Sequence, residues 1–499
     1  MGIELLLDMA VDGYGERVAI GSHDDGSSYV DLGALSRGAA TVAAEHGATH
    51  VATVAVMGPL LPIVLFGGSY AGVPAVPLNY RLSTPALDEL LATLERPLVI
   101  ADADFAEALR RPGRVVLTTE EFLAEALAAE PAGPACPADD DPAVLLFTSG
   151  TTSRPKCVVL THANLVSYVL GTVEFAGAGI DESQLVTVPP YHIAGVASAL
   201  TSTYSGRRVV HLPRFSPVGW LTTVRRESVT SAMVVPTMLA RIVDHLDGGL
   251  ADAPSLRALA YGGARMPTPV LERALHAFPE VDFTNAYGLT ETSSTIAVLG
   301  PEDHRRAIAA TEPRTRARLG SAGRAVAGVE IGVRDAGGNL LAPGAVGEIV
   351  VRGPQVSGAY VGIGSVLDSD GWFATRDRGR LDEDGYLYVD GRSDDVIIRG
   401  GENIAPAEVE DALARMPGVR DCAVFGLPDD EWGERLAAAV VAEPGQAPTT
   451  DEVRSYLRAR LRGSRTPDDV FIVDALPYSA TGKLLRRHLV ADFARPAAG

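Results

Sequence analysis

A polar loop directly behind an apolar strand constrains this chain more than any other segment. The strand is Leu145-Leu146-Phe147, and the Thr148–Lys156 loop holds three threonines, two serines, one glycine and two cations. Small residues let a backbone turn tightly around a phosphate, and the N–H groups and hydroxyls of such a turn donate to its oxygens. The pattern predicts a phosphate-binding loop, with a plain polar surface loop as the alternative.

This loop differs from a Walker A motif. That motif needs a second glycine directly before the lysine and a helix directly after it. Here Lys156 is followed by Cys157-Val158-Val159-Leu160, which predicts a strand, and the next helix is expected to begin after an N-cap at Thr161. A phosphate loop between two strands indicates another class of nucleotide-binding protein.

Composition favours a large α/β protein. The chain has 499 residues, too many for one compact core, and is 46% hydrophobic with only 6% aromatic residues, which is typical of parallel sheets covered by helices. Its net charge of −20 argues against nonspecific binding of nucleic acid and against docking on anionic membranes. An acidic protein that binds a polyanion such as ATP needs local cations and oriented N–H groups, which the loop supplies.

Cysteine usage and hydropathy indicate a cytoplasmic protein. Cys136, Cys157 and Cys422 are few and far apart, which fits a reducing compartment and predicts no structural zinc site. The first residues lack the features of a signal peptide. Apolar runs such as Leu60–Phe66 are broken by Gly or Pro well short of the ~18 residues of a membrane span, so they are expected to be core elements.

The pattern of predicted secondary structure divides the chain into three kinds of segment. Up to about residue 390, strand-like runs alternate with helical patterns, as in βα units. Between Val326 and Tyr388 turn signals separate short β runs, which predicts a small β-barrel-like subdomain or sheet. After Gly391 a strand at Val396–Ile398, a helix at Ala407–Met416 and further elements predict a compact α+β unit of roughly 100 residues.

Several further clusters follow the loop in a consistent order. Each alone reads as a turn or a solvated segment. They are Val188–Gly195, Tyr261–Ala264, Asn285–Thr292, Gly371–Asp377, Asp390–Asp395, Arg399–Ile404 and Pro477–Lys483. Together, over most of the chain, they resemble the adenylate-forming superfamily, which contains acyl-CoA synthetases, luciferases and the adenylation domains of peptide synthetases.

The resemblance implies an AMP-forming acid–thiol ligase. Members activate a carboxylic acid with ATP and Mg²⁺ to an acyl-adenylate, release pyrophosphate, and in most cases pass the acyl group to a thiol such as coenzyme A. It also implies an N-terminal adenylation domain over residues 1–393 and a mobile C-terminal domain over residues 394–499.

The nucleotide-binding residues follow from the same resemblance, motif by motif. Glu291, assisted by Thr148, matches the Mg²⁺ ligand, and a hard oxygen donor suits that ion. Thr290 matches the α-phosphate contact, Tyr287 the ring that stacks on adenine, and Asp377 with Arg392 the ribose contacts. The remaining matched positions are Ser149, Gly150, Thr151, Thr152 and Lys156 at the phosphates, and Gly262, Gly263, Ala264, Asn285, Ala286 and Gly288 along the adenine and acyl groups.

The two half-reactions are expected to use different parts of the C-terminal unit. Lys483 resembles the catalytic lysine of adenylation, whose charge would bridge the substrate carboxylate and the α-phosphate. Asp394 matches the hinge about which this unit rotates. After rotation Gly400, Gly401 and Glu402 would replace Lys483 and line the channel for the pantetheine arm of CoA.

This chain departs from the family pattern at three positions. Ser153 and Cys157 stand where glycines are usual, and Arg376 replaces the glycine that commonly precedes the ribose-binding Asp. The Cβ atom of Ser153 restricts positive φ angles and is expected to tighten or slow the phosphate loop. None of the three residues removes a charged catalytic group, so a slow but active enzyme is expected.

The acyl pocket implied by the resemblance is apolar. His192 matches the residue that gates this pocket, and a buried core histidine is its alternative. The other matched positions are Gly195, Val196, Val235, Met238, Gly262, Ala286 and Leu289. Ala286 stands where malonate-type ligases carry an Arg, and Tyr191-His192 lacks the Asp of amino-acid-activating domains, so a hydrophobic monocarboxylic acid is expected. A ligase that loads a phosphopantetheinyl carrier protein and a non-catalytic ATP-binding scaffold are the alternatives; oligomeric state is left open.

Overall fold

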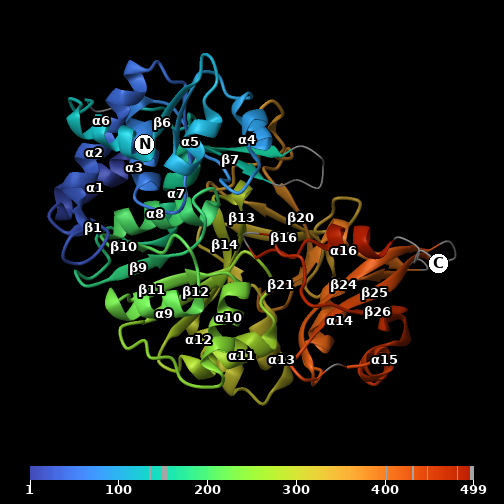
Figure 1. The fold of residues 1–499 in the computed structure, drawn as a ribbon. Helices are drawn as coiled ribbons and strands as arrows, with labels where there is room; N and C mark the ends of the chain where they lie inside the picture. The colour runs from blue at the N-terminus through green and yellow to red at the C-terminus, as the bar shows by residue number, and fades with distance from the viewer. Residues whose placement is uncertain are drawn as a thin grey trace.

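The computed structural model describes residues 1–133, 136–148, 155–399, 402–429, 432–446, 448–479 and 482–494 (Figure 1). Up to about residue 325, and together with residues 359–365, they form a five-layer α/β/α/β/α body with two large mixed sheets. The sequence-based expectation of an α/β fold is therefore confirmed. A smaller sheet and a C-terminal α+β unit complete the chain, the latter in orange and red at the right of the view.

The first large sheet has the strand order β15-β14-β13-β12-β11-β9-β10-β1-β2. Its central strands are parallel, while β2, β14 and β15 run antiparallel to their neighbours. The bounds are β1 Val18–Ile20, β2 Ser27–Ser28, β9 Ser183–Val186, β10 Arg208–His211, β11 Ser231–Val234, β12 Ala258–Gly262, β13 Asp282–Leu289, β14 Ser294–Leu299 and β15 Arg324–Ala325.

The second large sheet has the order β19-β18-β8-β7-β4-β3-β5-β6. Its strands β4, β3, β5 and β6 are parallel, and β7 and β8 form the antiparallel pair that the sequence predicts on both sides of the polar loop. The bounds are β3 His50–Val54, β4 Ala75–Pro77, β5 Pro97–Ala101, β6 Val115–Thr118, β7 Pro142–Thr148, β8 Lys156–Thr161, β18 Ala359–Tyr360 and β19 Gly364–Ser365.

Helices fill the space between the two sheets and cover their outer faces. The middle layer holds α1 (Glu4–Tyr14), α2 (Tyr29–Glu45), α3 (Leu60–Ala71), α6 (Thr119–Ala128), α7 (His162–Thr172) and α8 (Ile193–Ser205), which share one large apolar core with both sheets. The outer layers are α4 (Thr84–Leu91) and α5 (Ala103–Leu109) on the second sheet, and α9 (Pro217–Arg226), α10 (Pro236–Leu246), α11 (Thr268–Ala277) and α12 (Pro301–Ala309) on the first. The short α13 (Pro313–Ala317) follows α12.

The hairpin-rich segment forms an open antiparallel sheet in the order β16-β17-β20-β21, and the expectation of a barrel-like subdomain was wrong. The edge strands β16 and β21 pair with no strand beyond these four among the described residues, so no barrel closes there. The bounds are β16 Glu330–Arg334, β17 Gly347–Arg352, β20 Phe373–Leu381 and β21 Leu387–Arg392.

The C-terminal unit is a five-stranded sheet with helices on both faces. Its strands are β22 (Ile397–Arg399), β23 (Glu402–Ile404), β24 (Val419–Asp429), β25 (Gly433–Ala442) and β26 (Asp469–Ile472). Two apolar clusters lie on opposite faces, one under α14 (Pro406–Leu413) and α15 (Thr450–Arg458), the other under α16 (Arg486–Phe493). A compact α+β unit was predicted for this region.

The helix behind the polar loop begins as the sequence predicts. The Thr161 side chain accepts a hydrogen bond from the Asn164 N–H, and the Asn164 side-chain oxygen accepts one from the Thr161 N–H. This capping box fixes the end of β8 and the start of α7. None of the helices in the described part of the chain is long and apolar enough to cross a membrane.

We expect Thr161→Ala to lower the free energy of unfolding by about 1 kcal/mol, because an N–H at the start of α7 loses its acceptor. Thr161→Ser keeps the hydroxyl and serves as the matched control. Urea denaturation followed by circular dichroism measures the difference. Equal stability of the Ala and Ser variants would contradict the capping role.

Candidate functional site

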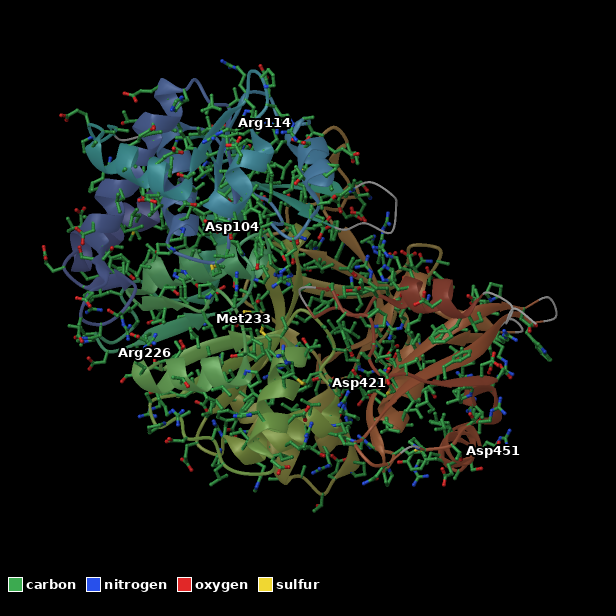
Figure 2. All side chains as sticks on the ribbon, viewed as in Figure 1. Asp104, Arg114, Arg226, Met233, Asp421 and Asp451 are labelled. Carbon is green, nitrogen blue, oxygen red and sulfur yellow. The ribbon has the colours of Figure 1, made fainter. Side chains whose placement is uncertain are left out.

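The carboxyl ends of three neighbouring parallel strands bring most of the predicted site residues together. Strand β11 leads into Val235, β12 ends at Gly262, and β13 ends at Leu289 before a short 3₁₀ turn over Thr290–Thr292. Ligands bind outside the carboxyl ends of strands in open α/β sheets. Figure 2 shows Met233, on β11, near the middle of the molecule, so this edge lies at the centre of the fold.

Gly262 allows two of these strands to approach closely. It pairs with Ala286 on β13, and a Cβ atom on Gly262 would lie 2.2 Å from the Ala286 carbonyl oxygen. No side chain fits there without separating the strands. The adjacent Gly263 is exposed and Ala264 is half-buried, which leaves a low surface that a flat ring can approach.

Lys156, Tyr360 and Glu291 form one connected group beside the polar loop. The Tyr360 hydroxyl donates to Glu291 Oε1 at 2.9 Å, and the Lys156 ammonium lies 5.1 Å from the centre of the Tyr360 ring. On β7, the Thr148 hydroxyl donates to the Lys156 carbonyl at 3.4 Å. The loop residues Ser149, Gly150, Thr151 and Thr152 lie outside the described residues.

The Glu291 carboxylate suits a divalent cation. Its Oε1 accepts the Tyr360 hydroxyl, while no ion pair or hydrogen bond to Oε2 is found in the part of the chain that the structure describes. The Glu291 carbonyl accepts the Ser357 N–H at 2.9 Å, which holds the turn in place. A fixed hard oxygen donor is what Mg²⁺ prefers.

Tyr287, Asp377 and Arg392 form a second polar group. The Tyr287 hydroxyl donates to Asp377 Oδ2 at 2.7 Å, and Arg392 Nη1 lies 3.3 Å from Oδ1 of the same carboxylate. Burial raises the pKa of Asp377, and the hydrogen bond from Tyr287 and the charge of Arg392 oppose that rise. The carboxylate is therefore held in one orientation, with two partners already in place.

Arg376 adopts a backbone conformation that favours glycine. Its φ angle is 61°, in the left-handed region. Strand β20 bulges here against β17, because Val350 pairs with Ala374 while Glu348 pairs with Arg378. A bulge redirects the following side chain, which here is Asp377. The departure from the family's glycine thus falls at a position where a Cβ atom strains the backbone.

Lys483 approaches this edge from the C-terminal unit. The neighbouring Gly482 has a φ of 75°, and a Cβ atom on it would lie 2.5 Å from Thr237 Oγ1 and 3.0 Å from Val235 Cγ2. The loop therefore lies directly against the start of α10. Lys483 keeps an exposed surface, yet desolvation lowers its pKa. The Arg392 charge lowers it further, while Asp377, Asp395 and Glu291 oppose the shift.

His192 caps the N-terminus of α8 and lies within reach of the Lys483 charge. Its Nδ1 accepts the Ala194 N–H at 3.3 Å, so the neutral ring carries its proton on Nε2. Burial lowers the pKa of this imidazole first, and the Lys483 charge lowers it further. His192 is half-buried in a cap position, not enclosed in a core.

The other residues predicted for the acyl pocket lie around the same edge. Val235 contacts the Gly482 loop, Leu289 packs beside Ile296, and Met238 accepts a weak hydrogen bond from Thr187 at 3.7 Å. Gly195 and Val196 lie in the first turn of α8, with Val196 fully buried in the central core. Gly195 and Val235 are buried as well, whereas Met238 and Leu289 are half-buried.

Other predicted residues are not brought to this site. Glu402 pairs with Arg465 at 2.8 Å within the C-terminal unit, and the Asn285 side chain donates to the Ser321 carbonyl at 3.0 Å. Gly400 and Gly401 lie outside the described residues. Asp394 is exposed in the short turn between β21 and β22, the connection between the two parts of the chain.

Sequence reasoning missed Tyr360. It follows Gly358-Ala359 on a two-residue strand, more than 200 residues after the loop it contacts, and no local periodicity marks it. The register of β18 beside β8 brings it to Lys156, and only the folded sheet shows this pairing.

Two family models match the chain. One described as AMP-binding enzyme covers residues 7–361, and one described as AMP-binding enzyme C-terminal domain covers residues 408–483. The resemblance read from the motifs is therefore confirmed.

This chain is also similar to individual known proteins over most of its length. The chain is 37% identical to a feruloyl-CoA synthase of Amycolatopsis sp over 451 residues, which is 87% of each chain. It is 33% identical to the fatty acid–[acyl-carrier-protein] ligase ScoC of Streptomyces coeruleorubidus over 85% of this chain and 83% of that one. Among solved structures, the o-succinylbenzoate CoA synthetase of Bacillus subtilis with ATP and a magnesium ion matches with a TM-score of 0.82 and 30% identity, covering 97% of this chain and 98% of that chain.

We expect Arg376→Gly to raise the free energy of unfolding by about 1 kcal/mol, because glycine adopts this φ angle without strain. Arg376→Ala removes the same charge but keeps a Cβ atom, so it separates backbone strain from electrostatics. Thermal melting of the three proteins measures the effect. Equal midpoints for the Gly and Ala variants would show that the backbone at this bulge is unstrained.

Proposed function

Because this chain belongs to the AMP-binding enzyme family, we propose that it is an acid–CoA ligase that forms an acyl-adenylate from ATP and a hydrophobic monocarboxylic acid. A carboxylate oxygen bonds to the α-phosphorus as the bond to pyrophosphate breaks. The CoA sulfur then bonds to the acyl carbon, its proton is lost to solvent, and AMP leaves. Lys483 lies close enough to Asp377 and Glu291 for their charges to raise its pKa, and to His192 for its own charge to lower the pKa of that ring; this placement carries the proposal.

We assign the nucleotide to the two polar groups. Lys156 and the loop before it hold the β and γ phosphates, Thr290 contacts the α-phosphate, and Gly262–Ala264 with Tyr287 bound the adenine. Asp377 and Arg392 bind the ribose hydroxyls, since a carboxylate is a natural acceptor from a diol. Glu291, assisted by Thr148, would hold Mg²⁺, which supplies charge neutralisation at the phosphates.

Lys483 stabilises the transition state of the first half-reaction. Two anions, the carboxylate and the α-phosphate, must approach one another, and a fixed ammonium between them offsets their repulsion. Neighbouring carboxylates favour the charged form of Lys483 even though desolvation opposes it. His192 closes the acyl pocket, and its Nε2–H has no acceptor among the residues that the structure describes.

The second half-reaction requires this arrangement to change. We propose that residues 394–499 rotate about Asp394, which withdraws Lys483 and brings Gly400, Gly401 and Glu402 to the site as a channel for CoA. Asp394 is exposed in the short turn between β21 and β22, where a change of backbone angles would move the whole C-terminal unit. A phosphopantetheinyl carrier protein is the alternative acceptor, favoured by the likeness to a ligase that loads such a protein.

ATP–pyrophosphate exchange across aryl, alicyclic, straight-chain and dicarboxylic acids, with and without CoA, tests this function. Exchange with an apolar monocarboxylic acid and a thioester on adding CoA is the expected result. Exchange without a thioester would indicate a carrier-protein acceptor. No exchange with any acid, together with nucleotide binding in calorimetry, would favour a scaffold without turnover.

We expect Tyr360→Phe to raise the Mg²⁺ concentration needed for half-maximal exchange about tenfold, because Glu291 loses the donor that orients it. The ring beneath Lys156 is kept, so ATP binding without Mg²⁺ should not change. Tyr456→Phe, on α15, is the control. An unaltered Mg²⁺ dependence would show that Tyr360 does not orient Glu291 for the metal.

We expect Lys483→Ala to slow adenylation by about two to three orders of magnitude, the usual effect of losing one preorganised charge at a transition state. Thioester formation from supplied acyl-adenylate should survive. Gly482→Ala keeps the lysine but places a Cβ atom against Thr237, so it should slow adenylation alone, by about tenfold. Rapid-quench assays of each half-reaction measure both; equal loss in the two steps would refute the assignment.

A further inference from the structure

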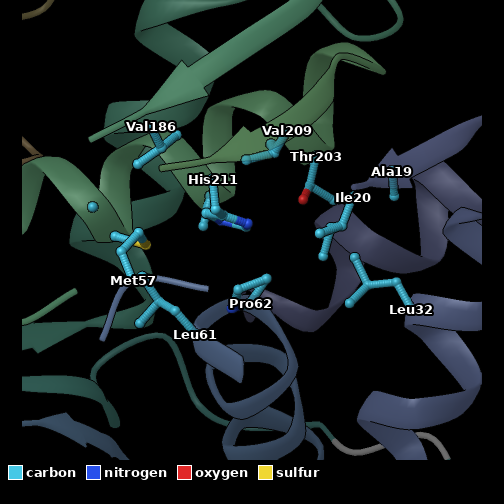
Figure 3. Close-up of a pocket in the computed structure, with 12 residues that line it drawn as sticks. Ala19, Ile20, Leu32, Met57, Leu61, Pro62, Val186, Thr203, Val209 and His211 are labelled. Carbon is cyan, nitrogen blue, oxygen red and sulfur yellow. The ribbon is translucent and has the colours of Figure 1, made fainter. Parts of the chain in front are cut away.

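A cavity lies between α8 and the neighbouring strands, beyond the first turn of α8 (Figure 3). Gly195, Ala199 and Thr203 line it at intervals of four residues, which puts them on one face of the helix. Opposite them lie Ile20 and His211, at the ends of β1 and β10. The cavity has room for a small group, such as a water molecule or a hydroxyl.

His211 is a polar side chain in apolar surroundings. Figure 3 shows its ring nitrogen directed into the cavity, and the Thr203 hydroxyl oxygen faces the same space. Neither side chain has a hydrogen-bond partner among the described residues. Burial lowers the pKa of His211 to about 4, so the ring is neutral at pH 7 and offers one donor and one acceptor. Thr203 is buried and His211 is half-buried, and a polar group that is shielded from water without a partner destabilises the fold.

The cavity adjoins the proposed acyl pocket. Gly195 belongs to both, and the His192 cap that faces Lys483 comes three residues before it. His211 ends β10 as Val186 ends β9, at the same carboxyl edge as the rest of the site. From Gly195 to Thr203 the helix rises about 12 Å, so a group at the Thr203 end of the cavity would have to be carried there by a chain of about that length.

We infer that His211 and Thr203 bind a neutral hydrogen-bonding group, such as a hydroxyl, at the far end of the acyl tail. The inference rests on the proposed function and narrows its substrate from any apolar acid to one with a polar tip. The cavity lining holds no carboxylate, lysine or arginine. A charged group in the cavity would therefore lose its hydration without meeting an opposite charge. A neutral hydroxyl satisfies both side chains.

The test compares matched acids that differ only in that group. Straight-chain acids of graded length, each with and without an ω-hydroxyl, and aryl acids with and without a para-hydroxyl are assayed by ATP–pyrophosphate exchange. For the best chain length we expect kcat/KM to favour the hydroxylated acid about tenfold, because a site built around a polar group rejects the analogue that lacks it.

Variants at the cavity separate recognition from structure. His211→Leu should remove the preference by lowering kcat/KM for the hydroxylated acid about tenfold while leaving its apolar partner unchanged. Thr203→Val, which keeps the shape, should reduce the preference in part, and His211→Gln, which keeps hydrogen bonding, should restore some of it. Melting temperatures of all variants report their folding.

The possible failures differ from one another. Exchange with both members of every pair at equal kcat/KM would overturn the role of His211 and leave the ligase proposal standing; the cavity would then hold only water. Equal losses for both acids in His211→Leu would show a structural role. No exchange with any acid would overturn the proposed function, and this inference with it.

Discussion

The site depends on one contact, that of the Gly482 turn with Val235 and Thr237. Only a residue without a Cβ atom fits between these side chains and the turn. Because the turn lies this close to the carboxyl ends of the strands, the adjacent Lys483 comes near Asp377 and Glu291. A lysine from the C-terminal unit thus lies at a site built on the central sheet, and the proposed rotation of that unit would withdraw it.

Fixed polar contacts hold the other charged side chains of the site in place. Tyr287 and Arg392 hold Asp377, while Tyr360 joins Glu291 to Lys156. These groups come from strands of three different sheets, so each sheet must form before the site exists. Preorganised dipoles and charges of this kind need no rearrangement when the reaction occurs, which is the main electrostatic advantage of an enzyme over water.

Part of the fold and of the candidate site could be predicted from the sequence, because it depends on residues that are close together in the chain. The loop between two strands, the Thr161 cap and the compact C-terminal unit follow from short-range patterns, and the ordered motifs indicated the family. Tyr360 and His211 could not be found this way, because their importance comes from strand register and from packing between distant segments. Closure of a barrel was wrongly expected since turn signals predict hairpins but not whether the edge strands meet. The roles assigned to individual residues remain predictions.

A reversible lock between the two parts of the chain tests the central claim most directly. Arg265, which follows β12, forms an ion pair with Asp411 on α14, so cysteines at these two positions can be joined by a cleavable thiol-specific crosslinker while the Gly482 turn keeps its sequence. Each single cysteine variant, treated in the same way, is the control for the native thiols. The account predicts that the crosslinked protein still catalyses ATP–pyrophosphate exchange but forms no thioester from supplied acyl-adenylate and CoA, and that cleavage of the crosslinker restores thioester formation. Thioester formation at the unlocked rate in the fully crosslinked protein would contradict it.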